Sequence, residues 1–199
     1  MTEVKVGNDT YRAKIIWDEN ANRPDKDMDL VIAFYEAENA EVVGGILKYL
    51  IHGTEAWQVV EKTCYAASID EPDLDDQDVR EHWLEAIRDE VIVRQVRAGY
   101  NRRYIVHTTP DMCAKLGVDW ANAEKAMDQE IEMLVQWCEG DIYGYTIEKA
   151  HGCDHCGHIE WENVDSCWGF YGNDIEKNGM LDNLPSDMHA VLRAAQWPY

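Results

Sequence analysis

Two cysteines in the last third of the chain are spaced in a way that suits a metal ion. Cys153 and Cys156 are separated by two residues, and Gly157 follows the second of them. The thiolates of such a tight turn can bind one tetrahedral zinc ion, and glycine relieves the strain of a backbone that turns its N–H groups towards sulfur. The spacing therefore predicts half of a structural zinc site, a zinc knuckle.

The other ligands of this site must come from outside the cysteine pair, because a structural zinc ion is almost always four-coordinate. The sequence has no second Cys-x2-Cys pair, but histidines lie on both sides of the first. We expect His158 and His151 to complete the site, with His155 as a close alternative. Bound zinc would order a hairpin tip that has no apolar anchor. Two arrangements stay open, a zinc ion within one chain and a zinc ion between two copies.

The same stretch allows other interpretations. A thioredoxin-like redox pair needs its cysteines at the start of a helix, whereas here we expect a strand to follow. A hydrolase would pair Ser166 or Cys167, as a nucleophile, with a nearby histidine. The last alternative is a pair of surface cysteines without metal. No nucleophile-elbow, Walker, HExxH or Rossmann signature occurs, so the sequence does not indicate an enzyme.

The charge of the chain restricts its partners. There are 39 Asp and Glu residues against 18 Lys and Arg, which gives a net charge of −21. Direct binding to nucleic acid or to an anionic membrane is excluded, because like charges repel where association begins. This charge equals that of about 36 Å of duplex DNA, so a compact acidic protein can present a DNA-like field to a basic groove. The alternative is that the charge only maintains solubility.

Carboxylates are densest between residues 70 and 89, and we expect this segment to bind a basic partner. The side chains concerned are Asp70, Asp73, Asp75, Asp76, Asp78, Glu81, Glu85 and Asp89. The last four fall near one side of a helix if the helix begins around Asp76. The alternative is a solvated loop followed by the first turn of a helix, where carboxylates complement the helix dipole.

The pattern of elements predicts an α+β fold in a single domain, residues 1–199. Alternating apolar residues predict strands at 10–17 and 30–35, which we expect to pair as an N-terminal β-hairpin. An acidic region with central helices follows at 36–100. Within it, residues 40–51 are ambiguous, because a pair of glycines weakens a helical pattern there.

The C-terminal half has clearer signals. Thr109 is expected to cap a short helix that has Pro110 at its first position. A long helix is predicted from about residue 120 to 138, followed by a C-terminal β-hairpin at 140–172 with the cysteines and histidines at its tip. A final helix at 187–196 would have Ser186 as its cap.

The expected location of the chain is a reducing cytoplasm. No apolar run reaches the roughly 18 residues of a membrane span, and the N-terminus has no apolar run of the signal-peptide type. In such a compartment the 6 cysteines are expected to be free thiols or metal ligands rather than disulfides.

The C-terminal hairpin carries two motifs, Gly-Asp-Ile-Tyr-Gly at 140–144 and Asp-Ser-Cys-Trp-Gly-Phe-Tyr-Gly at 165–172. Together with the strand, acidic linker and strand of residues 12–36, they make the chain resemble a group of small uncharacterised bacteriophage proteins. The resemblance implies a phage origin and a location in the host cytoplasm. It carries no assigned activity and no catalytic residues.

Charge and phage resemblance together predict a binding protein that inhibits a host nucleic-acid-binding defence system, of the anti-restriction or anti-CRISPR type, by DNA mimicry. Its partner would be a host defence protein or a nuclease complex. The alternative is a zinc-clipped structural or accessory phage protein without inhibitory activity, which forms a homodimer or binds another phage protein. A hydrolase is the third hypothesis, and it needs a pocket around Ser166, Cys167 and a histidine.

Overall fold

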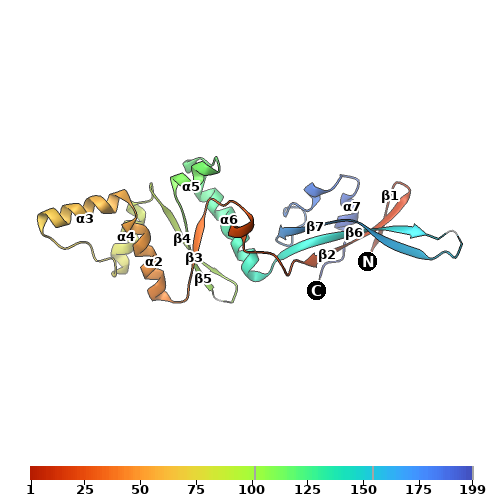
Figure 1. Ribbon diagram of the computed structural model, residues 1–199, viewed down its shortest axis with the longest axis horizontal. Helices are drawn as coiled ribbons and strands as arrows, with labels where there is room; N and C mark the ends of the chain where they lie inside the picture. Colours follow the sequence, from red (N-terminus) through yellow and green to blue (C-terminus); the bar gives the residue numbers. More distant parts are fainter. Residues whose placement is uncertain (101, 154, 199) are drawn as a thin grey trace. The chain divides into compact units, whose positions relative to one another are not determined.

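A computed structural model gives the three-dimensional structure of the chain (Figure 1). It describes residues 1–100, 102–153 and 155–198. These residues form both helices and strands, and the strands form two antiparallel sheets. The α+β fold class that the sequence predicts is therefore confirmed.

The contacts within the chain divide it into two compact units. The first unit combines residues 1–22 with residues 136–199, and the second holds residues 23–135. The single domain expected from chain length stays a prediction, because units defined by contacts need not fold separately.

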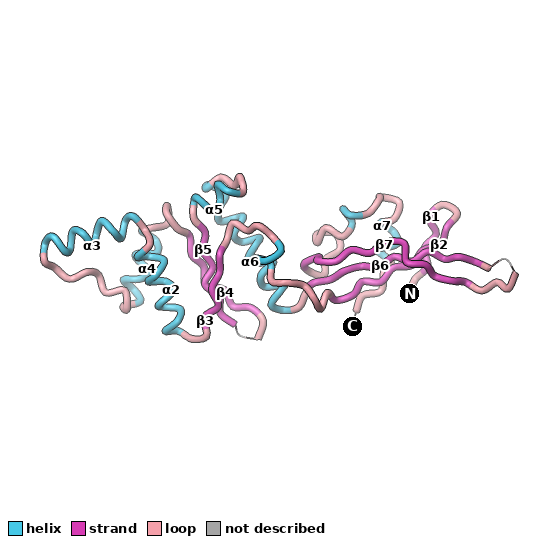
Figure 2. The backbone as a smooth tube through the Cα atoms, in the orientation of Figure 1, coloured by secondary structure: helices cyan, strands magenta, loops and turns pink. Residues whose placement is uncertain are grey.

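The first unit is built on a four-stranded sheet in the order β1-β2-β6-β7. Its strands are β1 Glu3–Val6, β2 Asp9–Trp17, β6 Ile142–Gly152 and β7 Ile159–Tyr171. The two longest, β6 and β7, form the expected C-terminal hairpin (Figure 2). Cys153 and Cys156 lie in the loop that joins them. The long helix expected before this hairpin is present as α6, Ala123–Glu139.

The N-terminal hairpin is confirmed, but one of its strands is not the expected one. β1 and β2 pair through a two-residue turn in which Gly7 has φ +61°, as the first position of a type II′ turn requires. The strand expected around 30–35 appears as β3, Ala33–Ala37, and belongs to the second unit. β2 uses its other edge for β6, where Ile15 lies opposite Tyr145. The predicted pairing of 10–17 with 30–35 is therefore wrong.

One face of this sheet carries the core of the first unit. The strands bury Ala13, Ile15, Tyr145 and Ile147 there, and the apolar residues of the C-terminal region cover them. The alternation of β2 and β6 is what places these side chains on one face. The chain end adds to the sheet, because the backbone N–H of Ile15 donates to the carbonyl oxygen of Gln196 at 3.0 Å.

The final helix is shorter than expected. α7 runs over His189–Arg193, and a short 3₁₀ helix, η2, runs over Leu181–Asn183 before it. The N-cap residue of α7 is Met188, which makes no side-chain capping bond, so the expected cap at Ser186 is wrong. Burial of Val191 and Leu192 against the sheet holds this short helix instead.

The second unit is built on a three-stranded sheet in the order β3-β5-β4. Its other strands are β4 Ile92–Ala98 and β5 Arg102–Thr108. Its helical elements are α1 Pro24–Asp27, α2 Ala40–His52, α3 Glu55–Ala67, α4 Gln77–Ala86, α5 Pro110–Lys115 and the 3₁₀ helix η1 Trp120–Asn122, together with most of α6.

Side-chain caps explain where several helices of the second unit begin. Thr109 accepts from the backbone N–H of Met112 and so caps α5, as predicted. Thr54 caps α3 and Asp76 caps α4 in the same way. The ambiguous segment 40–51 forms α2, because burial of its apolar face outweighs the low helix propensity of the glycine pair.

Helices lie on both sides of the three-stranded sheet (Figure 1). On one side, Leu47 and Leu50 of α2 pack against Ile105 of β5. On the other side, α6 is fastened by ion contacts and hydrogen bonds: the guanidinium of Arg94 lies 3.2 Å from the carboxylate of Glu124. The same helix also holds the segment before β3, because the backbone N–H groups of Val31 and Ile32 donate to the carboxylate of Glu130.

Candidate metal site and acidic surface

The loop at the tip of the C-terminal hairpin is a tight turn around Cys153. The backbone N–H of Cys153 donates to the carbonyl oxygen of His158 at 2.8 Å, and the N–H of Gly157 donates to that of Cys153 at 2.9 Å. Gly157 has φ +69°, a conformation that favours glycine. Gly157 therefore closes the turn in a conformation that other residues rarely adopt.

The turn also surrounds one sulfur atom with hydrogen-bond donors. The backbone N–H of His155 bonds to the Cys153 sulfur and is the largest influence that lowers the pKa of this thiol. The thiol and the backbone N–H of Cys156 add to the effect. Both cysteines are exposed. The turn thus favours the thiolate, which is the form that binds zinc, and it brings the two predicted cysteine ligands together.

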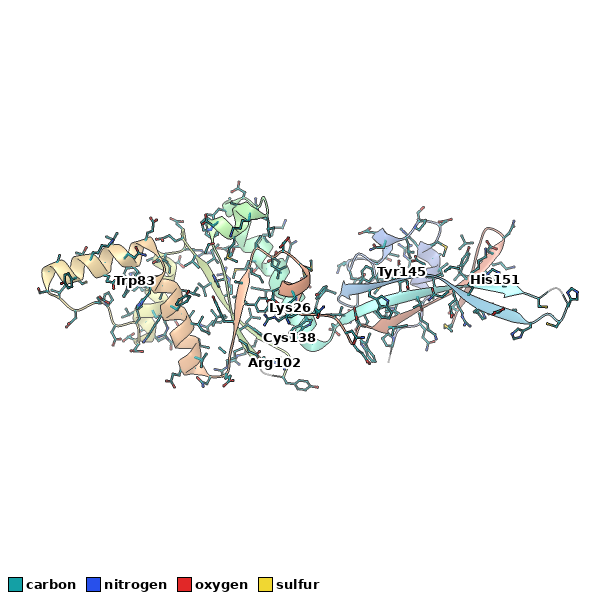
Figure 3. The ribbon with its side chains drawn as sticks, in the orientation of Figure 1. Lys26, Trp83, Arg102, Cys138, Tyr145 and His151 are labelled. Carbon is teal, nitrogen blue, oxygen red and sulfur yellow. The ribbon has the colours of Figure 1, made fainter. Side chains whose placement is uncertain are left out.

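The predicted histidine ligands are not gathered in the same way. His151 lies on β6 (Figure 3). Its Nε2 atom is 2.8 Å from the carboxylate of Glu162 on β7. His158 and His155 are exposed in the loop. Among the described residues, which leave out Asp154 of this turn, no three side chains of the ligand types form a cluster. The zinc site of Cys153, Cys156, His158 and His151 stays a prediction.

The acidic segment, defined as residues 70–89, lies wholly in the second unit. It consists of the loop before α4, α4 itself and the turn after it. All the predicted side chains are exposed: Asp70, Asp73, Asp75, Asp76, Asp78, Glu81, Glu85 and Asp89. Along α4, two exposed residues alternate with two half-buried ones. Asp78, Glu81 and Glu85 therefore lie on the outer side of the helix, while Trp83 and Leu84 face inward. Asp89 follows the end of the helix.

The positive charges near the acidic segment are already engaged. Lys48 pairs with Asp75 and lowers the pKa of that carboxyl group. Arg88 pairs with Glu85 and with Glu124. Arg80 donates to the carbonyl oxygen of Leu74 at 2.8 Å.

Most carboxylates of the acidic segment are left without a cationic partner. Within the part of the chain that the structure describes, no ion pair involves Asp70, Asp73, Asp76, Asp78, Glu81 or Asp89. The segment therefore presents uncompensated negative charge to solvent, which is what a basic partner surface requires.

The two candidate nucleophiles of the hydrolase hypothesis lie apart. Ser166 and Cys167 are consecutive residues of β7, so their side chains point to opposite faces of the sheet. Cys167 packs against the core of the first unit, whereas Ser166 is exposed. A single site that uses both is therefore not formed.

A groove in the first unit was not predicted from the sequence. Two hollows of about 570 and 560 Å³ adjoin each other and share Trp17, Asp18 and Glu19 in their linings. Trp168 lines the first hollow and Trp137 the second. These two hollows are called the tryptophan groove below. The only signal in the sequence is its richness in tryptophan, and most tryptophans are expected in cores and not in grooves.

Neither a membrane-spanning helix in the described ranges nor a known relative is found. Among the described residues, no helix combines the length and the apolar character that a membrane span needs. No protein-family model, curated protein or solved structure matches the chain.

Proposed function

We propose that this protein is an acidic phage-encoded inhibitor that occupies the nucleic-acid-binding surface of a host defence protein or nuclease complex, of the anti-restriction or anti-CRISPR type. One observation carries the proposal: the predicted carboxylates of the acidic segment are all exposed, and most of them have no cationic partner in the described structure. The resemblance of the two C-terminal motifs to phage proteins supports the proposal of a phage origin and of action in the host cytoplasm.

The physical basis of the proposed inhibition is electrostatic substitution for DNA. A groove that binds DNA is lined with Lys and Arg and attracts any surface with a similar density of negative charge. The carboxylates on the outer side of α4 lie on a helix, so the partner does not have to order the backbone that carries them. Association of this kind is fast at low ionic strength and weakens as salt is added.

The test is to compare a variant of the acidic segment with a matched variant of the first unit. The first carries lysine in place of Asp70, Asp78, Glu81 and Asp89, which neither cap a helix nor form an ion pair in the described structure. The control carries lysine in place of Glu3, Glu160, Asp182 and Asp187, which are exposed in the first unit. Both variants change the net charge equally.

The measurement has two steps. Tagged protein captures partners from host lysate at low and at high salt, and each captured protein is then tested for binding to duplex DNA in the presence of the inhibitor. We expect the wild-type and the control variant to displace DNA, and the acidic-segment variant to fail. Equal displacement by both variants would exclude the acidic segment as the inhibitory surface.

A second function is favoured by the turn around Cys153. We propose that the hairpin tip binds zinc, and that the protein then acts as a zinc-clipped structural or accessory phage protein, alone or as a homodimer. The N–H groups directed at the Cys153 sulfur support this function. Zinc content per chain tests it: the wild-type is expected to retain zinc through gel filtration, and a variant with serine at positions 153 and 156 is expected to lose it. Wild-type protein free of zinc after refolding in zinc would contradict this function.

A further inference from the structure

The tryptophan groove is built from exposed aromatic rings. Trp17 at the end of β2 is 43% exposed and Trp168 on β7 is 47% exposed. Tryptophan is the residue that gains most from burial, so two half-exposed rings beside one hollow are unusual for a structural role. Ile15, Ile16 and Pro198 add apolar surface to the first hollow.

A break in the β6–β7 ladder places Trp168 in the groove. Tyr143 pairs with Phe170 and Tyr145 pairs with Cys167, so Trp168 and Gly169 together lie opposite the single residue Gly144. Gly169 takes up the extra length with φ +86°. Bulges of this kind redirect a side chain, and they occur preferentially beside binding sites.

Trp17 is held by a chain of hydrogen bonds. It lies opposite Tyr143 in the β2–β6 pair, and its indole N–H donates to the Tyr143 hydroxyl. That hydroxyl donates in turn to the carboxylate of Asp141 at 3.2 Å. Trp197 packs edge-on against Tyr143, with ring centroids 5.2 Å apart. These contacts fix the Trp17 ring before any ligand arrives.

The charged residues in the lining are all acidic. Asp18 and Glu19 line both hollows, and Glu139 and Asp141 line the second. No lysine or arginine is among the described residues that line either hollow. Aromatic faces and carboxylates together attract one kind of side chain, a cation with an extended flat surface.

We infer that the tryptophan groove binds an arginine side chain from a basic segment of a partner protein. The planar guanidinium stacks on an exposed tryptophan face while its N–H groups donate to Asp18 and Glu19. Charge complementarity selects this occupant, because an acidic or neutral segment would leave those carboxylates desolvated without a partner. The groove is in the first unit, so the inference does not depend on the acidic segment of the second unit.

The experiment measures the affinity of a peptide for the full-length protein by isothermal titration at about 0.15 M salt, where long-range attraction is screened. The probe alternates arginine with glycine. A matched peptide carries citrulline at each arginine position, which keeps the shape and removes the charge. The variants are Trp168→Ala, Trp168→Phe and a double change of Asp18→Asn with Glu19→Gln.

Two variants outside the groove serve as controls. Trp161→Ala removes a tryptophan from the same strand, where its ring contacts Arg12. Glu160→Gln removes an exposed carboxylate from that strand. Circular dichroism confirms that each variant is folded before its affinity is compared.

We expect the arginine peptide to bind about tenfold more weakly to Trp168→Ala and to the double variant, while Trp168→Phe keeps part of the affinity. The controls should bind as the wild-type does, and the citrulline peptide should not bind measurably. An unchanged affinity for Trp168→Ala and the double variant would overturn the inference, and so would equal binding of the two peptides. The charge-reversed variant of the acidic segment is expected to keep its affinity for the arginine peptide. A failure of the proposed inhibition can therefore be distinguished from a failure of arginine binding.

Discussion

The indole ring of Trp168 occupies the space in which Gly144 would otherwise carry a side chain. A Cβ atom at Gly144 would lie 2.2 Å from Cε3 of the ring and 2.8 Å from the carbonyl oxygen of Cys167. Neither distance is compatible with normal van der Waals contact, and the carbonyl oxygen belongs to the backbone and cannot rotate away. The glycine that ends the motif at 140–144 therefore makes room for the tryptophan of the motif at 165–172. This contact explains why the two motifs occur together.

The first prediction follows from this contact. Gly144→Ala is expected to lower the free energy of unfolding by about 1 to 3 kcal/mol, because β7 must move to accept the methyl group. It should also reduce binding of the arginine peptide, because Trp168 is displaced. Urea denaturation measures the stability. Gly152→Ala on the same strand is the control, since a Cβ atom there meets nothing within 4 Å. Equal stability of the two variants would contradict the prediction.

The second prediction concerns Glu130 of α6. Its carboxylate accepts the backbone N–H groups of Val31 and Ile32, both at 3.1 Å, and burial raises the pKa of this carboxyl group. Glu130→Ala leaves both donors unpaired and should cost about 2 kcal/mol or more of stability. Glu130→Gln keeps an acceptor and removes a partly buried charge, so it should cost less. Thermal unfolding checks both, with the exposed Asp128→Ala as a control that changes stability by under about 0.5 kcal/mol.

Local patterns in the sequence predicted the elements better than their pairing. The period of the long helix predicts an apolar stripe of Ala123, Met127, Ile131, Leu134 and Cys138. Ala123, Met127 and Leu134 are buried, whereas Ile131 and Cys138 are only partly buried. The strand at 10–17 was also correct, but its partner was wrong. Pairing depends on which edge is free and which apolar face matches, and the side-chain contact of Arg12 with Glu148 joins residues that are far apart in the chain. No local pattern carries that information.

In the candidate sites, too, local features could be predicted from the sequence, whereas features that depend on strand pairing could not. The turn around Cys153 could be predicted, because two cysteines separated by two residues and followed by glycine favour a tight turn, and Gly157 has the positive φ that suits it. The position of His151 could not be predicted, since its contact with Glu162 depends on the register of β6 and β7. The exposure of Trp168 depends on the bulge opposite Gly144, and a sequence pattern does not reveal where a ladder breaks.

The third prediction concerns the pH dependence of the second unit. His107 on β5 is buried, its Nδ1 atom has no hydrogen-bond partner in the described structure, and burial lowers the pKa of its imidazole. Its ring stacks on Tyr35 with centroids 5.6 Å apart. His52, Glu90 and Tyr49 line the same hollow of about 370 Å³.

Because the folded-state pKa of His107 lies below the unfolded value of about 6.5, protonation favours the unfolded chain. Stability should therefore be greatest above about pH 6.5 and should fall as the pH drops from there through the lower folded-state pKa. His107→Phe keeps a ring against Tyr35 and should flatten this dependence, as measured by urea midpoints between about pH 5 and 8. Replacing the exposed His82 by Gln is the control. Equal slopes for His107→Phe and the wild-type would contradict the prediction.

The last prediction tests the turn at the hairpin tip without metal. The N–H groups of His155 and Cys156 lower the pKa of the Cys153 thiol, so a larger fraction of it is thiolate at a given pH. In metal-free protein, alkylation of Cys153 by iodoacetamide should reach half of its maximal rate at a lower pH than an ordinary thiol, whose pKa is about 8.5. Mass spectrometry of peptides resolves each cysteine. Gly157→Val should move this midpoint upward, because a β-branched residue does not adopt the φ of +69° that closes the turn. A midpoint at or above that of a free cysteine peptide would show that the turn does not favour the thiolate, and the zinc-binding proposal would then lose its structural support.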